Sequence, residues 1–190
     1  MTLLDDQLQD HLHTVEATRT LIPQVISIAA EICTRLEVGG TVFTFGNGGS
    51  AADAQHFTAE LIGRYLRERR PLAAVSLSTD PSVTTCIAND YGYDRVLSRQ
   101  IEALVHPTDV VVAFSTSGTS PTVVAGLAAA QSCGALTVLL TGEVGQDAAA
   151  HTDHVLRVPS ARTARIQEGH VLLLHLLSEE IDRWAAGDTP

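Results

Sequence analysis

The chain has 190 residues, enough for one domain with a sizeable core, and its 45% apolar and 18% charged residues are typical of a globular protein. The formal net charge of −10 argues against nucleic-acid binding. No apolar run reaches the ~18 residues of a membrane span, and residues 1–10 lack the basic and apolar regions of a signal peptide, so we expect a cytoplasmic protein without a membrane partner.

The basic residues are all arginines, because the chain has no lysine. This excludes a Schiff base on lysine and a Walker A lysine. A bound phosphate must therefore be held by hydroxyls, backbone N–H groups or arginine. The cysteines, Cys33, Cys86 and Cys133, are widely spaced and form no zinc-type pair. They are expected to be buried thiols in a reducing compartment.

Two helices are predicted at the N-terminus, over residues 3–20 and 22–37. In the second, apolar residues recur at helical spacing, and Gly39-Gly40 ends it. An open α/β sheet does not require these helices. We expect residues 1–37 to be an oligomerisation extension of a single domain that spans residues 1–190.

From residue 41 onward, apolar runs typical of strands alternate with helical patterns. The predicted strands are 41–45, 72–77, 109–114, 135–140 and 154–158, and the predicted helices are 50–65, one from Pro81, 94–105, one from Pro121, and 163–185. This alternation predicts an α/β fold with a parallel five-stranded sheet flanked by helices on both faces. Such sheets bind ligands at the carboxyl ends of their strands.

One basic cluster falls near the end of the helix predicted over 50–65. Its members are Arg64, Arg67, Arg69 and Arg70. Because cations are favourable at the C-terminal end of a helix, a solvated helix end is favoured over a phosphate site.

Two loops lie at the carboxyl ends of predicted strands. Gly46-Asn-Gly-Gly-Ser50 follows the first strand, and Ser115-Thr-Ser-Gly-Thr-Ser120 follows the third and precedes Pro121. Small residues let the backbone approach a ligand closely, and N–H groups at a helix start favour an anion. The second loop adds five hydroxyls. A phosphate site is favoured over tight turns or helix caps.

The first loop also matches the dinucleotide fingerprint, as Gly46-x-Gly48-x-x-Ala51. That fingerprint needs an acidic residue ~20 positions on, at the end of the second strand. Asp80, the nearest candidate at that strand end, lies 29 residues after Ala51. We therefore expect no nucleotide cofactor.

Acid–base candidates lie on two predicted helices. His56 and Glu60 are four residues apart and share one helix face, so both can meet one substrate or one metal. Gln167, His170 and His175 lie in an apolar stretch of the last helix. A histidine there is often a core residue, but with two we expect at least one to be functional, since an imidazole pKa near ~6.5 suits proton transfer.

Four motifs in this order resemble the phosphoheptose isomerases, and the resemblance covers nearly the whole chain. The motifs are Gly46-Asn-Gly-Gly-Ser-Ala-Ala-Asp-Ala-Gln-His56, Asn89-Asp90-Tyr-Gly-Tyr, Ser115-Thr-Ser-Gly, and Arg165-Ile-Gln-Glu-x-His170 with His175. The resemblance implies the sugar-isomerase (SIS) fold, a flavodoxin-like sandwich. It also implies conversion of sedoheptulose 7-phosphate to D-glycero-D-manno-heptose 7-phosphate through an enediol.

The resemblance also assigns roles to residues. Glu60 would be the base that moves a proton between C1 and C2, and His175 the partner acid/base. The substrate-binding set would be Asn47, Gly48, Gly49, Ser50, Asn89, Asp90, Ser115, Thr116, Ser117, Ser120 and Gln167. Some relatives bind zinc through positions matching His56, Glu60, Gln167 and His175. Family members are tetramers with sites at subunit interfaces, which implies a homotetramer here.

Two features of the last helix bear on this expectation. Gln167 and His175 are eight residues apart, ~12 Å along a helix, so meeting at one metal requires that they lean together or come from two subunits. Leu172, Leu173 and Leu174 cannot all face one sheet, so the N-terminal helices or another subunit must cover at least one. Ala164 stands where some relatives carry an aspartate, which argues against a charge relay there.

Two alternatives remain open. The first is a SIS-fold isomerase that acts on another sugar phosphate. The second is a non-catalytic relative that binds a replication initiator protein. The presence of Glu60 with His175 favours the enzyme.

Overall fold

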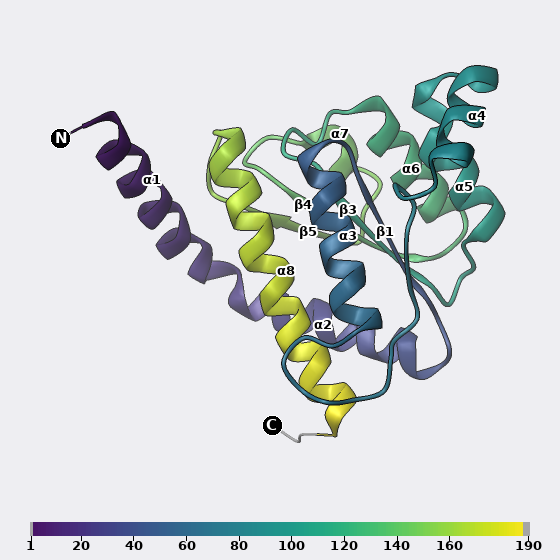
Figure 1. The fold of residues 1–190 in the computed structure, drawn as a ribbon, viewed down its shortest axis with the longest axis horizontal. Helices are drawn as coiled ribbons and strands as arrows, with labels where there is room; N and C mark the ends of the chain where they lie inside the picture. The colour runs from purple at the N-terminus through teal and green to yellow at the C-terminus, as the bar shows by residue number, and fades with distance from the viewer. Residues whose placement is uncertain (1, 188–190) are drawn as a thin grey trace.

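The computed structural model describes residues 2–187, whose centre is a five-stranded sheet (Figure 1). The strands are β1 (Val42–Gly46), β2 (Ala74–Ser76), β3 (Val110–Phe114), β4 (Leu136–Thr141) and β5 (His154–Arg157). All neighbours are parallel, in the order β2-β1-β3-β4-β5. Every residue of β1, β3 and β4 is buried, as their near-continuous apolar sequences predict. The predicted α/β architecture is thus confirmed.

Helices cover both faces of this sheet (Figure 1). They are α1 (Leu3–Thr18), α2 (Ile22–Glu37), α3 (Gly49–Ile62), α4 (Pro81–Tyr91), α5 (Val96–Leu104), α6 (Pro121–Ser132), α7 (Gln146–Ala149) and α8 (Thr163–Ala186), with short 3₁₀ turns at Arg19–Leu21 and Tyr93–Arg95. The core on one face is shared with α2, α3 and α8, and the core on the other with α5 and α6. The four-residue α7 is too short to leave a periodic signal in the sequence.

The register of the sheet places the two predicted ligand loops side by side. Gly46, the last residue of β1, pairs with Phe114, the last residue of β3. The glycine loop and the serine loop therefore leave the same edge of the sheet from adjacent strands.

The end of α3 differs from the prediction. The helix stops at Ile62 and Gly63 follows as its cap, whereas the sequence predicted a helix to residue 65. The arginine cluster that follows is solvated only in part: Arg64 and Arg70 are exposed, as predicted. The Arg69 side chain, by contrast, is 1% exposed and pairs with the fully buried Asp182 of α8 at 2.8 Å. This ion pair joins segments far apart in the sequence, so local pattern gave no sign of it.

The leucine run of α8 is largely covered within the chain. Leu173 and Leu174 are fully buried in the core shared with α2, and Leu172 is half-buried. Residues 22–37 therefore act here as a cover for the last helix.

The first helix, α1, extends away from the sheet (Figure 1). Its contacts with the start of α8 are polar: Arg162 pairs with Asp10, and His11 pairs with Glu168. Its leucines are exposed, with Leu8 at 57% and Leu12 at 51%.

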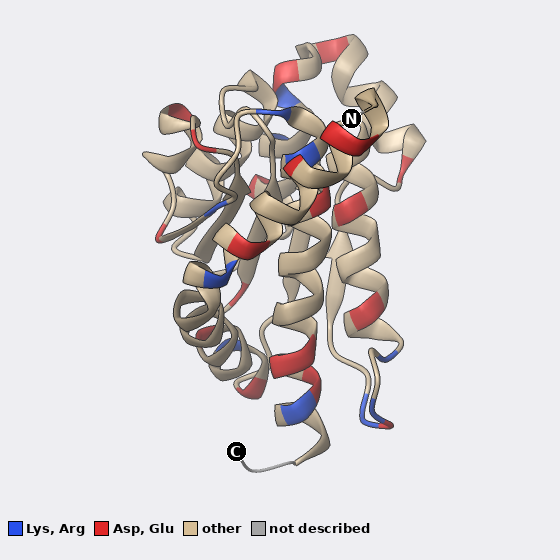
Figure 2. Cartoon of the chain, turned by 90° about the vertical axis from the view of Figure 1, so that its left-hand side faces the viewer, with Lys and Arg blue, Asp and Glu red and all other residues tan. Residues whose placement is uncertain are grey.

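Figure 2, turned by 90° from Figure 1, shows acidic positions spread over many of the helices and loops, with fewer basic positions between them. This distribution agrees with the formal net charge of −10.

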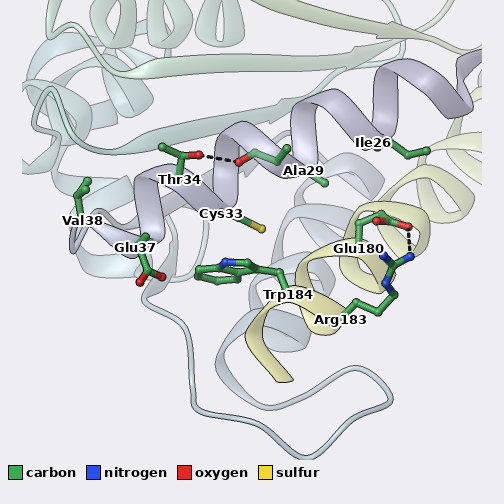
Figure 3. Close-up of a pocket in the computed structure, with 10 residues that line it drawn as sticks. Ile26, Ala29, Cys33, Thr34, Glu37, Val38, Glu180, Arg183 and Trp184 are labelled. Carbon is green, nitrogen blue, oxygen red and sulfur yellow. Dashed lines mark hydrogen bonds and ion pairs between the residues drawn. The ribbon is translucent and has the colours of Figure 1, made fainter. Parts of the chain in front are cut away.

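The cysteines follow the prediction only in part. Cys33 is buried in a groove of about 460 Å³ between α2 and α8, beside Trp184 (Figure 3). Burial raises the pKa of the Cys33 thiol to about 12, so it is unreactive. Cys86 is exposed and Cys133 half-buried, contrary to the expectation of three buried thiols.

Among residues 2–187, no helix combines the length and apolarity that a bilayer crossing requires.

Candidate active site

Asn47 joins the two ligand loops at the carboxyl edge of the sheet. Its amide nitrogen donates to the Ser120 hydroxyl at 2.9 Å, and its amide oxygen accepts from the Tyr93 hydroxyl at 3.0 Å. The backbone makes a sharp turn at Gly48, whose φ is +56°. This conformation favours glycine and brings the chain directly into α3. A cavity of about 130 Å³ lies beside Asn47 and is lined by Gly46, Asn47, Gly48, Ala51, Leu77, Ser78, Thr84, Tyr93, Val96, Leu97 and Thr122.

The serine loop divides its hydroxyls between structure and surface. Ser115 is buried, and its hydroxyl accepts from the Gly118 backbone N–H at 3.1 Å, which shapes the turn. Ser117 and Thr119 are exposed and bond to each other at 3.2 Å. Thr116 and Ser120 are half-buried. The exposed hydroxyls are free to exchange their mutual bond for an anion, which Ser115 cannot do without changing the turn.

Asn89 and Asp90 lie apart from these loops in the hydrogen-bond network. Both are exposed at the end of α4, where the Asn89 amide donates to the Asp90 carboxylate at 2.8 Å. Neither bonds to the glycine or serine loop within the described chain. Their substrate-binding role remains a prediction.

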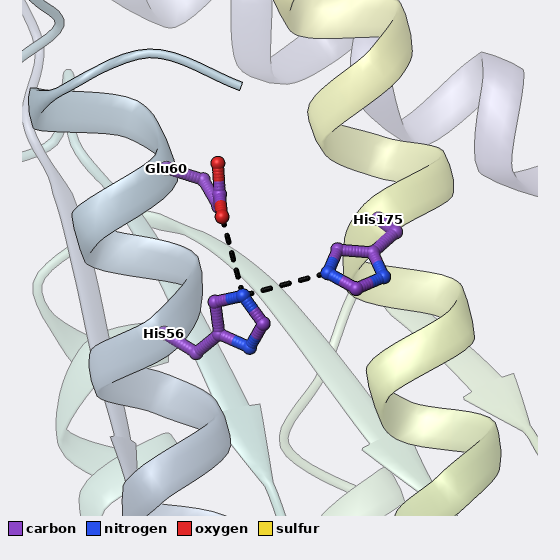
Figure 4. Close-up of side chains that lie close together, drawn as sticks. All are labelled: His56, Glu60 and His175. Atoms are coloured by element: carbon purple, nitrogen blue, oxygen red, sulfur yellow. Dashed lines mark hydrogen bonds and ion pairs between the residues drawn. The ribbon is translucent and has the colours of Figure 1, made fainter. Parts of the chain in front are cut away.

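Three titratable side chains from α3 and α8 meet in one cluster (Figure 4). The His56 Nε2 lies 3.2 Å from Glu60 Oε1 and 3.4 Å from His175 Nε2. The pair on α3 follows from the four-residue spacing, while His175 comes from a helix 119 residues further along the chain. The cluster is partly open, with His56 39% and Glu60 20% exposed.

The electrostatics of the cluster favour a neutral His175. Burial lowers the pKa of His175, the nearby His56 lowers it further, and Glu60 opposes both. The ligand atoms of His56, Glu60 and His175 all lie within 4.8 Å of one another. Two imidazole nitrogens and a carboxylate oxygen are donors that fit a divalent transition-metal ion. The arrangement can therefore exchange protons with a ligand or hold a metal.

Gln167 lies at a different level of the same two helices. A Cβ atom on Gly49 would lie 2.6 Å from the side-chain amide nitrogen of Gln167, so the Gln167 side chain packs against the first turn of α3. His56 is seven residues further along α3, about 10 Å away along the axis. Gln167 thus accompanies the glycine loop, whereas His175 accompanies His56 and Glu60. Its assignment as a fourth metal ligand remains a prediction.

His170 is a core residue rather than a second acid–base group. It is fully buried against Phe114, with ring centroids 6.0 Å apart. Neither ring nitrogen has a hydrogen bond of normal geometry among the described residues. Burial lowers the pKa of His170 to about 4, and a contact with the Thr141 backbone opposes this only in part.

We expect this histidine to make folding stability pH-dependent. The unfolded chain protonates a histidine near pH ~6.5, whereas the folded chain protonates His170 only near pH 4. The unfolded state therefore binds the proton first as the pH falls and is stabilised relative to the folded state. Between pH ~6.5 and pH 4, the free energy of unfolding should decrease by about 3 kcal/mol. Urea unfolding at several pH values measures this loss. The His170→Leu protein should show a flatter profile, and an equal slope in both proteins would contradict the assignment.

The structure adds two tyrosines that were not singled out from the sequence. Tyr93, in the Asn89–Tyr93 motif, bonds to Asn47. Tyr65 stacks on the His175 ring, with centroids 5.6 Å apart and planes at 25°. Tyr65 was assigned to a helix that in fact ends three residues earlier, so the pattern gave no reason to place it at the site.

Comparison with known proteins gives consistent results. Residues 6–142 match the model of the SIS domain family. The chain is 45% identical over 182 residues to phosphoheptose isomerase 1 of Campylobacter jejuni, covering 96% of this chain and 98% of the relative. It superposes on a phosphoheptose isomerase structure from Neisseria gonorrhoeae with a TM-score of 0.89 and 40% identity, over 94% of this chain and 96% of the other. For a phosphoheptose isomerase from Francisella tularensis, the TM-score is 0.91 and the identity 33%, over 96% of this chain and all of that one. These matches run along nearly the whole length of both partners, and the chain belongs to the phosphoheptose isomerase family of SIS-domain proteins.

Proposed function

We propose that the protein is an aldose–ketose isomerase that converts sedoheptulose 7-phosphate to D-glycero-D-manno-heptose 7-phosphate. The observation that carries this proposal is the cluster of Glu60, His56 and His175, which lies about 10 Å along α3 from the glycine loop and the serine loop joined to it. The relatives named phosphoheptose isomerase support the choice of a heptose phosphate.

In the proposed mechanism, the Glu60 carboxylate removes a proton from C1 of the ketose. The resulting enediol receives that proton at C2, which gives the aldose. His175, held neutral by its surroundings, moves the hydroxyl proton between O1 and O2, or assists opening of the sugar ring. No atoms are gained or lost overall.

The proton that Glu60 takes from C1 can exchange with solvent before it reaches C2. Incubation of the protein with sedoheptulose 7-phosphate in D₂O should therefore place deuterium at C2 of part of the product, as measured by NMR. Complete transfer of the C1 proton to C2 without any deuterium uptake would favour a hydride shift over the enediol.

The phosphate would be held without a cationic lysine. The serine-loop hydroxyls and the backbone at the start of α6 would supply hydrogen bonds to the phosphate oxygens. Asn47, Gly48, Gly49, Ser50 and Gln167 would line the sugar.

We expect Ser117→Ala to weaken sugar-phosphate binding. A hydrogen bond to a charged group contributes ~1.5–3 kcal/mol, so the Kd should rise about 10- to 100-fold. The unfolding midpoint should change little, because Ser117 is exposed and bonds only within its loop. Calorimetric titration measures the Kd. Ser132→Ala is the matched control, since that exposed hydroxyl bonds only to a carbonyl of its own helix. Equal affinity of the parent for phosphorylated and unphosphorylated sugar would contradict the phosphate site.

Zinc is the metal we propose for the cluster. His56, Glu60 and His175 would hold it, and Gln167 is the candidate for a fourth ligand. When bound, zinc would stabilise negative charge on a substrate oxygen.

We also propose a homotetramer assembled through α1. Four exposed leucines on this helix support it: Leu3, Leu4, Leu8 and Leu12. Exposed apolar surface of this kind is typical of an interface between subunits.

We therefore expect the parent protein to sediment as a species larger than 20.2 kDa. Leu8→Glu should shift it toward the monomer, because a charge on the buried side of an interface is costly. Gln9→Glu adds the same charge at a neighbouring exposed position and should leave the assembly intact. A fully active 20.2 kDa species in the parent would contradict a required assembly.

A further inference from the structure

The segment between α3 and β2 is organised by one buried carboxylate of α8. Asp182 is fully buried and accepts hydrogen bonds from three consecutive backbone N–H groups, those of Tyr65, Leu66 and Arg67, at 3.4, 3.1 and 2.7 Å. Arg69 Nε donates a further bond at 2.8 Å. Burial alone would raise the pKa of Asp182, but these bonds outweigh it and lower the pKa, so the group is ionised. The carboxylate thereby fixes the path of residues 65–69.

Arg69 connects this carboxylate to the backbone of Glu60. Its Nη2 donates to the Glu60 carbonyl at 2.6 Å, and its Nη1 donates to the Leu61 carbonyl at 2.8 Å. The last carbonyls of a helix have no intrahelical partner, so the guanidinium caps the end of α3. The Arg69 side chain is 1% exposed and has little freedom to move. Glu60 is thus anchored to α8 through Arg69 and Asp182.

The same carboxylate positions a ring against His175. The Tyr65 backbone N–H bonds to Asp182, and the Tyr65 ring stacks on the His175 imidazole at 5.6 Å. His175 lies seven residues before Asp182 on α8, about two turns away. The buried Asp182 carboxylate is therefore connected to Glu60 through Arg69 and to His175 through Tyr65.

We propose that Asp182 and Arg69 are positioning residues for the isomerisation. They hold the Glu60 backbone and the stacked His175 ring at the spacing that proton transfer requires. This inference rests on the proposed function of Glu60 and His175. A purely stabilising role is a weaker account of the pair, because buried ion pairs often contribute little net stability. A displacement of about 1 Å at a reacting group can lower a rate about 100-fold.

The test replaces the carboxylate by a neutral group of the same shape. Both carboxylate oxygens of Asp182 accept hydrogen bonds from this segment. In Asp182→Asn, an NH₂ group replaces one of these oxygens and cannot accept from the N–H groups that face it. The segment that carries Tyr65 and Arg69 therefore loses part of its attachment to α8. We expect kcat to fall at least about 10-fold. We expect KM to change less than about threefold, because the phosphate loops lie at the other end of α3, ~20 Å away.

Glu179→Gln is the matched control. It removes the ion pair of 2.9 Å between Arg67 and Glu179, which joins the same segment to the same helix but touches neither Glu60 nor Tyr65. Its kcat should stay within about twofold of the parent. If Asp182→Asn does not fold, Arg69→Gln is the second variant, since it leaves the three backbone bonds of Asp182 in place. It should lower kcat in the same way.

A second readout does not depend on activity. In protein labelled with ¹³C-histidine, the stacked Tyr65 ring should shift the His175 ring-proton resonances upfield, with His175→Gln as the assignment control. These resonances should move downfield in Asp182→Asn and stay in place in Glu179→Gln. If the parent shows no isomerase activity, the proposed function fails while the chemical shifts still decide whether Asp182 positions His175. Unchanged kcat or unchanged His175 resonances in folded Asp182→Asn would overturn the inference.

Discussion

The Glu60→Gln protein is expected to turn over sedoheptulose 7-phosphate at least about 100-fold more slowly than the parent. Glutamine keeps the size of the side chain and an oxygen that can face His56, so the cluster geometry should persist. It cannot accept a proton from carbon, and so the base of the proposed mechanism is lost. Steady-state kinetics measure the change in kcat.

Two further measurements make this result specific. The Kd for the sugar phosphate and the unfolding midpoint should both stay close to those of the parent, because the phosphate loops and the core are unchanged. Near-normal turnover in a folded Glu60→Gln protein would rule out Glu60 as the base.

His175→Gln should lower kcat by about 100-fold as well. It should also weaken zinc binding by at least about 100-fold, because it removes one of three clustered ligands. Kinetics and titration of the metal-free protein with zinc measure the two effects. Unimpaired zinc affinity in His175→Gln would contradict its role as a ligand.

The pH dependence of the parent follows from the same cluster. Since burial and the nearby His56 lower the pKa of His175, its imidazole is neutral at pH 7. Activity of the parent should therefore fall only as the pH drops below about 6.5.

The geometry also predicts the outcome of mixing the two inactive variants. Glu60 and His175 of one chain already meet in the described structure. Hybrid assemblies of Glu60→Gln and His175→Gln subunits should therefore recover no activity. Recovery after subunit exchange would show that each site takes the two residues from different chains.

The fold was predictable because its signals are local. Continuous apolar strands, glycines after strands and prolines at helix starts indicate a parallel sheet without reference to distant residues. The serine loop was predictable for the same reason, and so was the approach of His56 to Glu60 across one helical turn.

What the sequence did not predict depends on contacts between distant segments. Arg69 was wrongly assigned to solvent because its partner, Asp182, lies 113 residues further along the chain. The stacking of Tyr65 on His175 was missed for the same reason. Resemblance to a family grouped His56, Glu60 and His175, but no spacing in the sequence placed α8 beside α3.

The central claim is tested most directly by the substrate panel. The rate of isomerisation of sedoheptulose 7-phosphate should be measured against five- and six-carbon ketose phosphates under the same conditions. We predict that kcat/KM is at least about 10-fold higher for the seven-carbon substrate. A higher value for a shorter sugar phosphate would indicate a different SIS-fold isomerase. No turnover of any of them by the folded protein would contradict an isomerase and favour a non-catalytic relative.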